Sequence, residues 1–310
     1  MKDKLIKIIF FGSDENSSAL LELLIKNNYN IQLVITKTEK QSGRKTNINL
    51  VKSIANENNI EMLETDKLSA KEFKFIKNIK PDIGILLSYG AIIPENIIKL
   101  FPSGILNIHP SLLPKYRGSS PIQYTLLNGD SKTGVSLMLL TKKMDAGPII
   151  AQERIKIEND DNYSSLSKKL FGVGNKLLIE NISKYISGEI KAKSQDEKNV
   201  SLTKIIKKED GLIDWKTDAK SINNKIKAFE NWPSAYTKFN GKILKIIDAE
   251  YLEKNSNNEI GKIFLEDSEI FIQCRQGLLK LKKVQLEGKS SCDIKSFING
   301  YKDFIGSVLS

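Results

Sequence analysis

The chain has 310 residues, of which 40% are hydrophobic, and it carries a formal net charge of +11. This length and apolar content predict a globular protein of two domains and exclude a disordered chain. The apolar runs are too short to span a membrane, and the two cysteines have neither a metal-binding nor a redox spacing, so we expect a cytoplasmic protein with no membrane segment and no metal site.

The first half of the chain predicts buried strands that alternate with amphipathic helices. Short apolar runs of the kind that form buried parallel strands cover 5–11, 31–35, 83–87 and 105–109. Helical patterns cover 18–26, 51–58 and 70–79, and a further helix begins at Ser120-Pro121 and ends at Asn128-Gly129. This order predicts an α/β fold with an open, mostly parallel, Rossmann-like sheet, whose functional site lies at the carboxyl ends of the strands.

The loop after the first strand does not fit a dinucleotide site. It reads Gly12-Ser13-Asp14-Glu15, without the second and third glycines of the dinucleotide motif. Its two carboxylates would also repel a phosphate. We therefore exclude a nicotinamide-dependent dehydrogenase.

The single histidine of the chain, His109, ends the fourth predicted strand. Alternation along that strand places Asn107 and His109 on one face and Leu106 and Ile108 on the other. An imidazole can exchange a proton near neutral pH, and an amide beside it can donate to an oxygen that becomes negative. Asp145 follows a predicted strand over 135–140 and is the candidate that orients the imidazole, so we expect Asn107, His109 and Asp145 to form a catalytic group.

The C-terminal part predicts a second domain of short strands. A long helix over 163–186 leads to a polar stretch, 191–198, which has the composition of a linker. Strand-like runs separated by turns such as Asn240-Gly241 then cover 235–239, 243–247, 260–265, 270–274 and 278–284. We expect a catalytic domain over 1–190, a linker over 191–205 and a small, OB-like β-barrel over 206–310.

Several motifs resemble those of the folate-dependent formyltransferase family. They are Asn107-Ile108-His109, Ser111-Leu112-Leu113-Pro114, Tyr116-Arg117-Gly118 and Asp145-Ala146-Gly147. The resemblance continues through 207–211 and Trp232-Pro233, so it covers the chain almost end to end. It implies that Asn107, His109 and Asp145 are the catalytic trio of a metal-independent enzyme.

The resemblance also implies the substrates. A formyl group would pass from 10-formyltetrahydrofolate to the α-amine of methionine on initiator methionyl-tRNA, for translation initiation, and we expect a monomer. The residues that would line the folate pocket are Ser111, Leu112, Leu113 and Pro114. The residues that would contact the tRNA, with the C-terminal barrel, are Arg44, Lys40 and Lys45, in a loop where the family usually has prolines and this chain has Asn47 and Asn49.

Three other functions are alternatives. One is a formyltransferase that acts on glycinamide ribonucleotide, which would normally end near residue 200 and have a phosphate-binding glycine loop where Asp14 and Glu15 stand. A formyltransferase that acts on an amino-sugar nucleotide shares the trio and often a C-terminal barrel, whereas Gly43-Arg44 and the 207–211 run favour tRNA. A non-catalytic RNA- or folate-binding protein would have no need of the trio.

Three further groups of residues have a structural interpretation, alone or beside a functional one. Tyr116 and Arg117 either fix their loop or contact a substrate. The basic run Lys280, Lys282 and Lys283 fits a phosphate contact or a solvated strand face. We expect Trp215 and Trp232 to pack in the core or at a domain junction.

Overall fold

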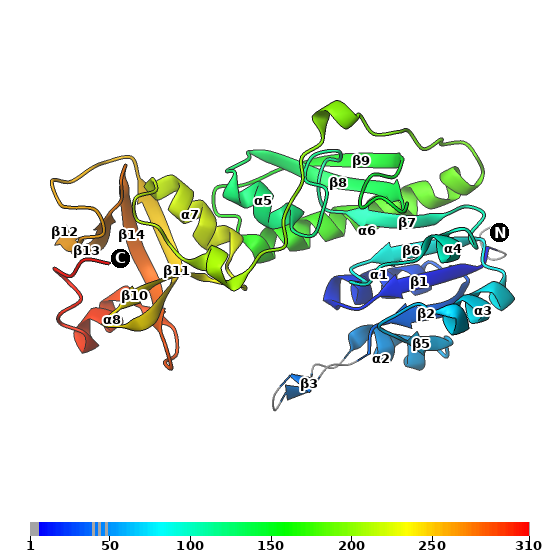
Figure 1. Cartoon of the computed structure of the whole chain (residues 1–310), viewed down its shortest axis with the longest axis horizontal. Helices are drawn as coiled ribbons and strands as arrows, with labels where there is room; N and C mark the ends of the chain where they lie inside the picture. Colours follow the sequence, from blue (N-terminus) through cyan, green and yellow to red (C-terminus); the bar gives the residue numbers. More distant parts are fainter. Residues whose placement is uncertain (1–5, 39–40, 43–44, 47–48, 310) are drawn as a thin grey trace. The chain divides into compact units, whose positions relative to one another are not determined.

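The computed structural model describes residues 6–38, 41–42, 45–46 and 49–309 (Figure 1). It divides into two compact units, and each is described here by itself. Unit 1 comprises Met1–Gly118, Gly134–Ile155 and Lys168–Leu202, and unit 2 comprises Ser119–Thr133, Lys156–Ser167 and Thr203–Ser310. In the described part of the chain, no helix has the length and apolar character needed to cross a membrane.

Unit 1 contains a seven-stranded sheet in the order β5-β2-β1-β6-β7-β8-β9. Its strands are β1 (Ile8–Gly12), β2 (Ile31–Thr36), β5 (Met62–Glu64), β6 (Ile83–Leu87), β7 (Ile105–His109), β8 (Lys132–Leu139) and β9 (Ile149–Lys156). The strands from β5 to β7 run parallel, and β8 runs antiparallel to β7. The prediction of an open, mostly parallel sheet is confirmed, although β5 and β9 were not expected. A separate pair, β3 (Gln41–Ser42) and β4 (Lys45–Thr46), is antiparallel.

Among the described residues, five helices accompany this sheet, and all except the short one over Glu95–Ile98 begin at a side chain that accepts a backbone N–H of the first turn. They are α1 (Glu15–Lys26), α2 (Leu50–Glu57), α3 (Ala70–Ile79), α4 (Glu95–Ile98) and α6 (Tyr163–Ile186), whose first turn lies in unit 2. The Asp14 carboxylate accepts the Ser17 N–H at 2.8 Å, and the Asp14 N–H donates to the Ser17 hydroxyl at 2.8 Å. Asp14 is therefore a helix cap, a structural role that agrees with the exclusion of a phosphate loop there.

Helix α6 determines which face of β7 is free for chemistry. A Cβ atom on Gly174 of α6 would lie 2.5 Å from Cγ2 of Ile108, so the helix backbone rests directly on this side chain. Because neighbouring strand residues point to opposite faces, Asn107 and His109 point away from α6. They share their face with Ile105, which belongs to the core of Ile9 and Phe11.

Unit 2 contains an antiparallel sheet in the order β10-β11-β14-β13-β12, with β15 against β14. The strands are β10 (Ala235–Phe239), β11 (Lys242–Leu252), β12 (Ile263–Glu266), β13 (Glu269–Gln273), β14 (Leu278–Leu286) and β15 (Cys292–Asp293). The helical elements are α5 (Pro121–Leu127), η3 (Lys208–Gly211), α7 (Ala219–Ala228) and α8 (Ile294–Gly300). This arrangement is consistent with the small barrel expected from the sequence.

The core of unit 2 contains an aromatic cluster and one of the two tryptophans. The Phe239 ring lies 5.0 Å from Phe304 and 6.3 Å from Phe297, centroid to centroid. Trp215 is buried and donates its indole N–H to Thr237 Oγ1 at 3.2 Å, whereas Trp232 is 55% exposed. Core packing is thus confirmed for Trp215. Trp232 lies outside the core and lines a surface cavity of about 380 Å³ with Lys208 and Lys245, and its place at a domain junction stays a prediction.

The polar stretch interpreted as a linker begins inside unit 1. The backbone of Lys193 exchanges two hydrogen bonds with Ile149, at 2.7 and 2.8 Å, next to the start of β9. Unit 1 continues to Leu202. The domain boundaries expected from the sequence remain a prediction.

Candidate active site

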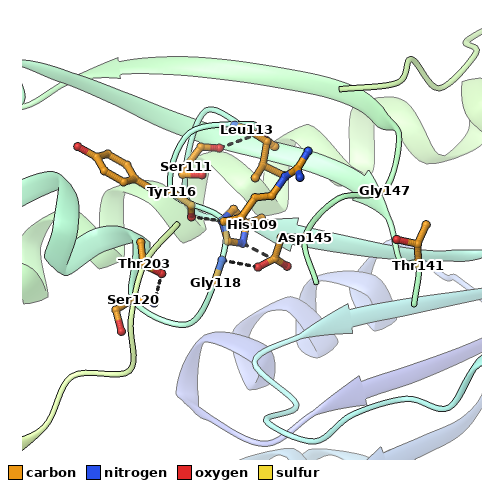
Figure 2. Close-up of polar contacts among 12 residues, drawn as sticks. His109, Ser111, Leu113, Tyr116, Gly118, Ser120, Thr141, Asp145, Gly147 and Thr203 are labelled. Atoms are coloured by element: carbon orange, nitrogen blue, oxygen red, sulfur yellow. Dashed lines mark hydrogen bonds and ion pairs between the residues drawn. The ribbon is translucent and has the colours of Figure 1, made fainter. Parts of the chain in front are cut away.

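His109 and Asp145 face each other at the carboxyl end of β7 (Figure 2). The His109 Nδ1 atom lies 3.8 Å from Asp145 Oδ1, an ion-pair distance that is longer than a hydrogen bond. Both side chains are nearly buried, with 6% and 13% of their surface exposed. The end of one predicted strand and the loop after another, 36 positions apart in the chain, therefore bring these two side chains together.

The segment from Tyr116 to Gly118 holds both side chains (Figure 2). The second ring nitrogen of His109, Nε2, lies 3.0 Å from the Tyr116 carbonyl oxygen. A carbonyl can only accept, so Nε2 carries the hydrogen of this bond and Nδ1 is left to face Asp145. The Gly118 N–H donates to Asp145 Oδ2 at 2.8 Å. One short loop thus fixes the imidazole orientation and the carboxylate orientation together.

The loop that carries Asp145 lies tightly against β8. A Cβ atom on Gly147 would come within 1.8 Å of the Leu139 carbonyl oxygen, so only glycine fits there. Asp145 itself has φ 48°, in the left-handed region that most residues avoid. The loop therefore adopts its conformation because its surroundings impose it.

Asn107 is buried but keeps its amide available. The residue is 7% exposed, and its side chain has no hydrogen bond to any other described residue. It lies two positions before His109 on the same strand face, at a Cα spacing of roughly 6–7 Å. An amide donor held rigidly beside an imidazole, and without a protein partner, is suited to bind an oxygen of a substrate.

The turn over Ser111–Pro114 is fastened to the sheet. The Ser136 hydroxyl donates to the Ser111 carbonyl at 2.6 Å and accepts the Leu113 N–H at 3.0 Å. Gln152 donates to the Leu113 carbonyl at 2.9 Å. Leu113 is buried, which agrees with a packing role for it, and Leu112 and Pro114 are half-buried.

Arg117 fixes its loop by charge-assisted contacts. Its side chain is almost fully buried, and it donates from Nε and Nη2 to Gln195 Oε1 and from Nη2 to Glu197. Hydrogen bonds from Arg117 and Lys143 lower the pKa of Glu197 to about 2. The backbone of Arg117 also donates to the Ser201 carbonyl at 2.9 Å. These contacts favour the interpretation that Arg117 holds the loop.

The basic residues expected to contact nucleic acid are only partly described. Arg44 and Lys40 lie outside the described residues, and for Lys45 the structure describes the backbone of β4 and not the side chain. In unit 2, Lys280 pairs with Glu269 at 3.0 Å and Lys282 with Glu250 at 3.1 Å. Carboxylates thus offset two of the three charges of that basic run.

Four groups that support the site were not expected from the sequence: Ser136, Gln152, Gln195 and the Gly118 N–H. Gln195 gave no signal, because it lies in a polar stretch about fifty residues after Asp145. Among the described residues, no cluster of three His, Cys, Asp or Glu side chains is arranged to hold a metal ion.

Comparison with known proteins agrees with the motifs. The formyl transferase model matches residues 6–182, and the model of the formyl transferase C-terminal domain matches residues 205–302. The methionyl-tRNA formyltransferase of Caldicellulosiruptor saccharolyticus is 37% identical, over 98% of this chain and 99% of that protein. Relatives with the same name occur in several other bacteria, at identities from 33% to 37%.

Two solved structures share the fold at lower identity. HypX from Aquifex aeolicus, in complex with tetrahydrofolic acid, matches 96% of this chain and 48% of its own, with a TM-score of 0.66 and 18% identity. An N-formyltransferase from Helicobacter canadensis, in complex with folinic acid and dTDP-3-aminofucose, matches 89% of this chain and 98% of its own, with a TM-score of 0.68 and 22% identity.

Proposed function

Because this chain belongs to the formyl transferase family, we propose that it transfers a formyl group from 10-formyltetrahydrofolate to the α-amine of methionine on initiator methionyl-tRNA. The observation that carries the proposal is the 37% identity to a methionyl-tRNA formyltransferase over nearly the full length of both proteins. Both domain models of the family match as well, so the similarity includes the C-terminal unit.

The chemistry requires a group that stabilises negative charge and a group that accepts a proton. The methionine amine attacks the formyl carbon, a C–N bond forms, and charge develops on the formyl oxygen. Asn107, whose amide has no hydrogen bond to another described residue, donates to that oxygen. In comparable sites one such donor lowers the barrier by about 2.7–4 kcal/mol.

His109 accepts the proton that the amine loses, and Asp145 stabilises the charge on the ring. With Nε2–H donated to the Tyr116 carbonyl, Nδ1 is the ring nitrogen that can accept a proton, and the Asp145 carboxylate 3.8 Å away stabilises the resulting positive ring. The bond from the formyl carbon to N10 of the folate then breaks, and N10 takes up a proton. The formylated amine is neutral, and tetrahydrofolate is released.

Substrate contacts follow from the family resemblance. Ser111, Leu112, Leu113 and Pro114 contribute to the folate pocket, in the turn that Ser136 and Gln152 hold in place. Arg44, with Lys40 and Lys45, contacts the tRNA, and the C-terminal unit adds further contacts. The protein acts as a monomer.

An acceptor assay tests the proposal directly. The purified chain is given 10-formyltetrahydrofolate with either initiator methionyl-tRNA or a set of amino-sugar nucleotides. Formylation of the methionyl-tRNA is the expected result. Formylation of an amino sugar in its place would overturn the proposal and assign the alternative acceptor.

The role of Arg44 has its own test. Arg44→Ala is expected to raise the KM for methionyl-tRNA and to leave the KM for the folate unchanged, because the loss concerns phosphate or base contacts alone. Arg154→Ala is the matched control, since it removes the same charge from an exposed position of β9. Equal effects of the two variants on the KM for tRNA would reject a specific role for Arg44.

A further inference from the structure

Gln195 uses all of its hydrogen-bonding capacity between Arg117 and the loop of Asp145. Its Oε1 atom accepts from Arg117 Nε at 3.0 Å and from Arg117 Nη2 at 2.8 Å. Its Nε2 atom donates to the carbonyl oxygens of Asp145 and Gly147, both at 2.8 Å. A side-chain amide offers two donors and two acceptor positions, and here each has a partner.

The orientation of this amide follows from chemistry. A guanidinium can only donate and a backbone carbonyl can only accept, so the oxygen must face Arg117 and the nitrogen must face the loop. The reversed amide would place two donors against two donors. Gln195 therefore connects the buried Arg117 to the backbone of Asp145 in one defined arrangement.

The loop requires such a restraint. Asp145 adopts φ 48°, and its carboxylate must direct Oδ1 to His109 and Oδ2 to the Gly118 N–H at the same time. Strained residues keep their conformation only when neighbouring contacts impose it. The bond to the Asp145 carbonyl acts on the residue whose side chain faces the imidazole.

From these contacts we propose that Gln195 is a positioning residue for the reaction: it holds the Asp145 backbone so that the carboxylate stays directed at His109. The inference rests on the proposed formyl transfer and extends it to a residue in the segment that leads from unit 1 into unit 2. Gln195 touches no reacting atom, and it acts through Asp145.

Two substitutions of Gln195 test this contact. Gln195→Glu keeps an acceptor for Arg117 and replaces the two donors by an oxygen that repels the carbonyls. Gln195→Met removes both halves at similar volume. We expect kcat to fall by about 10- to 100-fold in both variants, because a displacement of about 1 Å near the reacting groups has effects of this size. The KM values for tRNA and folate should change little.

The test has a control variant and a second measurement that does not depend on activity. Lys198→Ala changes an exposed residue three positions further on and should leave kcat unchanged. His109 is the only histidine of the chain, so its ring gives a single set of imidazole NMR signals. We expect these signals to move in both Gln195 variants at constant pH and to stay in place in Lys198→Ala.

The outcomes distinguish the inference from the proposed function. An unmodified chain that does not formylate methionyl-tRNA contradicts the function, whereas the His109 signals still test the positioning. A folded Gln195→Glu variant that has the kcat of the unmodified chain and unshifted His109 signals would overturn the inference. A rise in KM alone, without a fall in kcat, would also overturn it, because positioning of Asp145 acts on the chemical step.

Discussion

The buried Asn107 of unit 1 differs from the buried polar side chains Thr237 and Gln273 of unit 2. In unit 2, Thr237 accepts the Trp215 indole N–H, and Gln273 donates to the Cys274 carbonyl and accepts the Ser256 N–H. These groups satisfy one another and stabilise the fold. In unit 1, Asn107 is buried at the carboxyl end of β7 and has no hydrogen bond to another described residue. A buried amide without a protein partner beside the imidazole can donate to a substrate oxygen, whereas the paired groups of unit 2 contribute to its stability.

Each unit also contains its own spectroscopic probe. The single histidine lies in unit 1, and both tryptophans, Trp215 and Trp232, lie in unit 2. Tryptophan fluorescence therefore reports the unfolding of unit 2, and imidazole NMR signals report the active site. Substitutions in the two units can be compared without isolating either one.

The largest effect on stability is expected in the aromatic core of unit 2. Phe239→Ala removes the ring that contacts Phe297 and Phe304, and this loss should lower the free energy of unfolding by about 3–5 kcal/mol. Urea unfolding followed by tryptophan fluorescence measures it. The His109 signals should remain unshifted under native conditions, and a shift would contradict the separation of the two probes.

In contrast to Phe239→Ala, Asn107→Ala should lower activity and leave stability nearly unchanged. It removes the proposed donor to the formyl oxygen, so kcat should fall by about 100- to 1,000-fold, equivalent to about 2.7–4 kcal/mol in the barrier. The thermal unfolding midpoint should stay close to that of the unmodified chain, because the amide contributes no hydrogen bond to another described residue. A large loss of stability with near-normal turnover would contradict the catalytic role of Asn107 and indicate a structural one.

Trp215→Phe should have an intermediate effect on stability. The phenyl ring retains most of the packing but loses the hydrogen bond to Thr237, which should cost about 1 kcal/mol or somewhat more. Urea unfolding followed by circular dichroism measures the change, since the main fluorescent probe is removed. A Trp215→Phe variant as stable as the unmodified chain would contradict this contribution of the hydrogen bond.

Trp232→Ala should have the smallest effect on stability. The side chain is 55% exposed, and substitutions at such positions change the free energy of unfolding by about 0.5 kcal/mol or less. The measurement is thermal unfolding compared with Trp215→Phe. A destabilisation as large as that of Trp215→Phe would contradict the assignment of Trp232 to the surface.

The sequence allowed most of the regular elements to be predicted, because their patterns are local. Residues 70–79, 163–186 and 235–239 form α3, α6 and β10 as expected. The two missed strands of the unit 1 sheet lack a long apolar run: β5 has three half-buried residues, and four of the eight residues of β9 are exposed. Trp232 was expected in the core or at a domain junction, and nothing in the sequence shows that its side chain is largely exposed.

The site was predictable only in part. Asn107 and His109 share one strand, so alternation alone placed them together, and the motif around Asp145 supplied the third member. The supporting contacts join residues far apart in the chain, as between Gln195 and Asp145. Nothing in a polar segment distinguishes a glutamine that will be half-buried against Arg117 from one that is solvated.

The most direct test of the catalytic trio is the single-turnover rate of formyl transfer to initiator methionyl-tRNA by Asp145→Asn. The amide oxygen of asparagine can still accept the Gly118 N–H, so the loop is kept while the negative charge beside His109 is lost. The account predicts a fall in this rate of at least about 100-fold, with the His109 signals and the thermal unfolding midpoint showing a folded protein. A folded Asp145→Asn variant that transfers the formyl group as fast as the unmodified chain would contradict it.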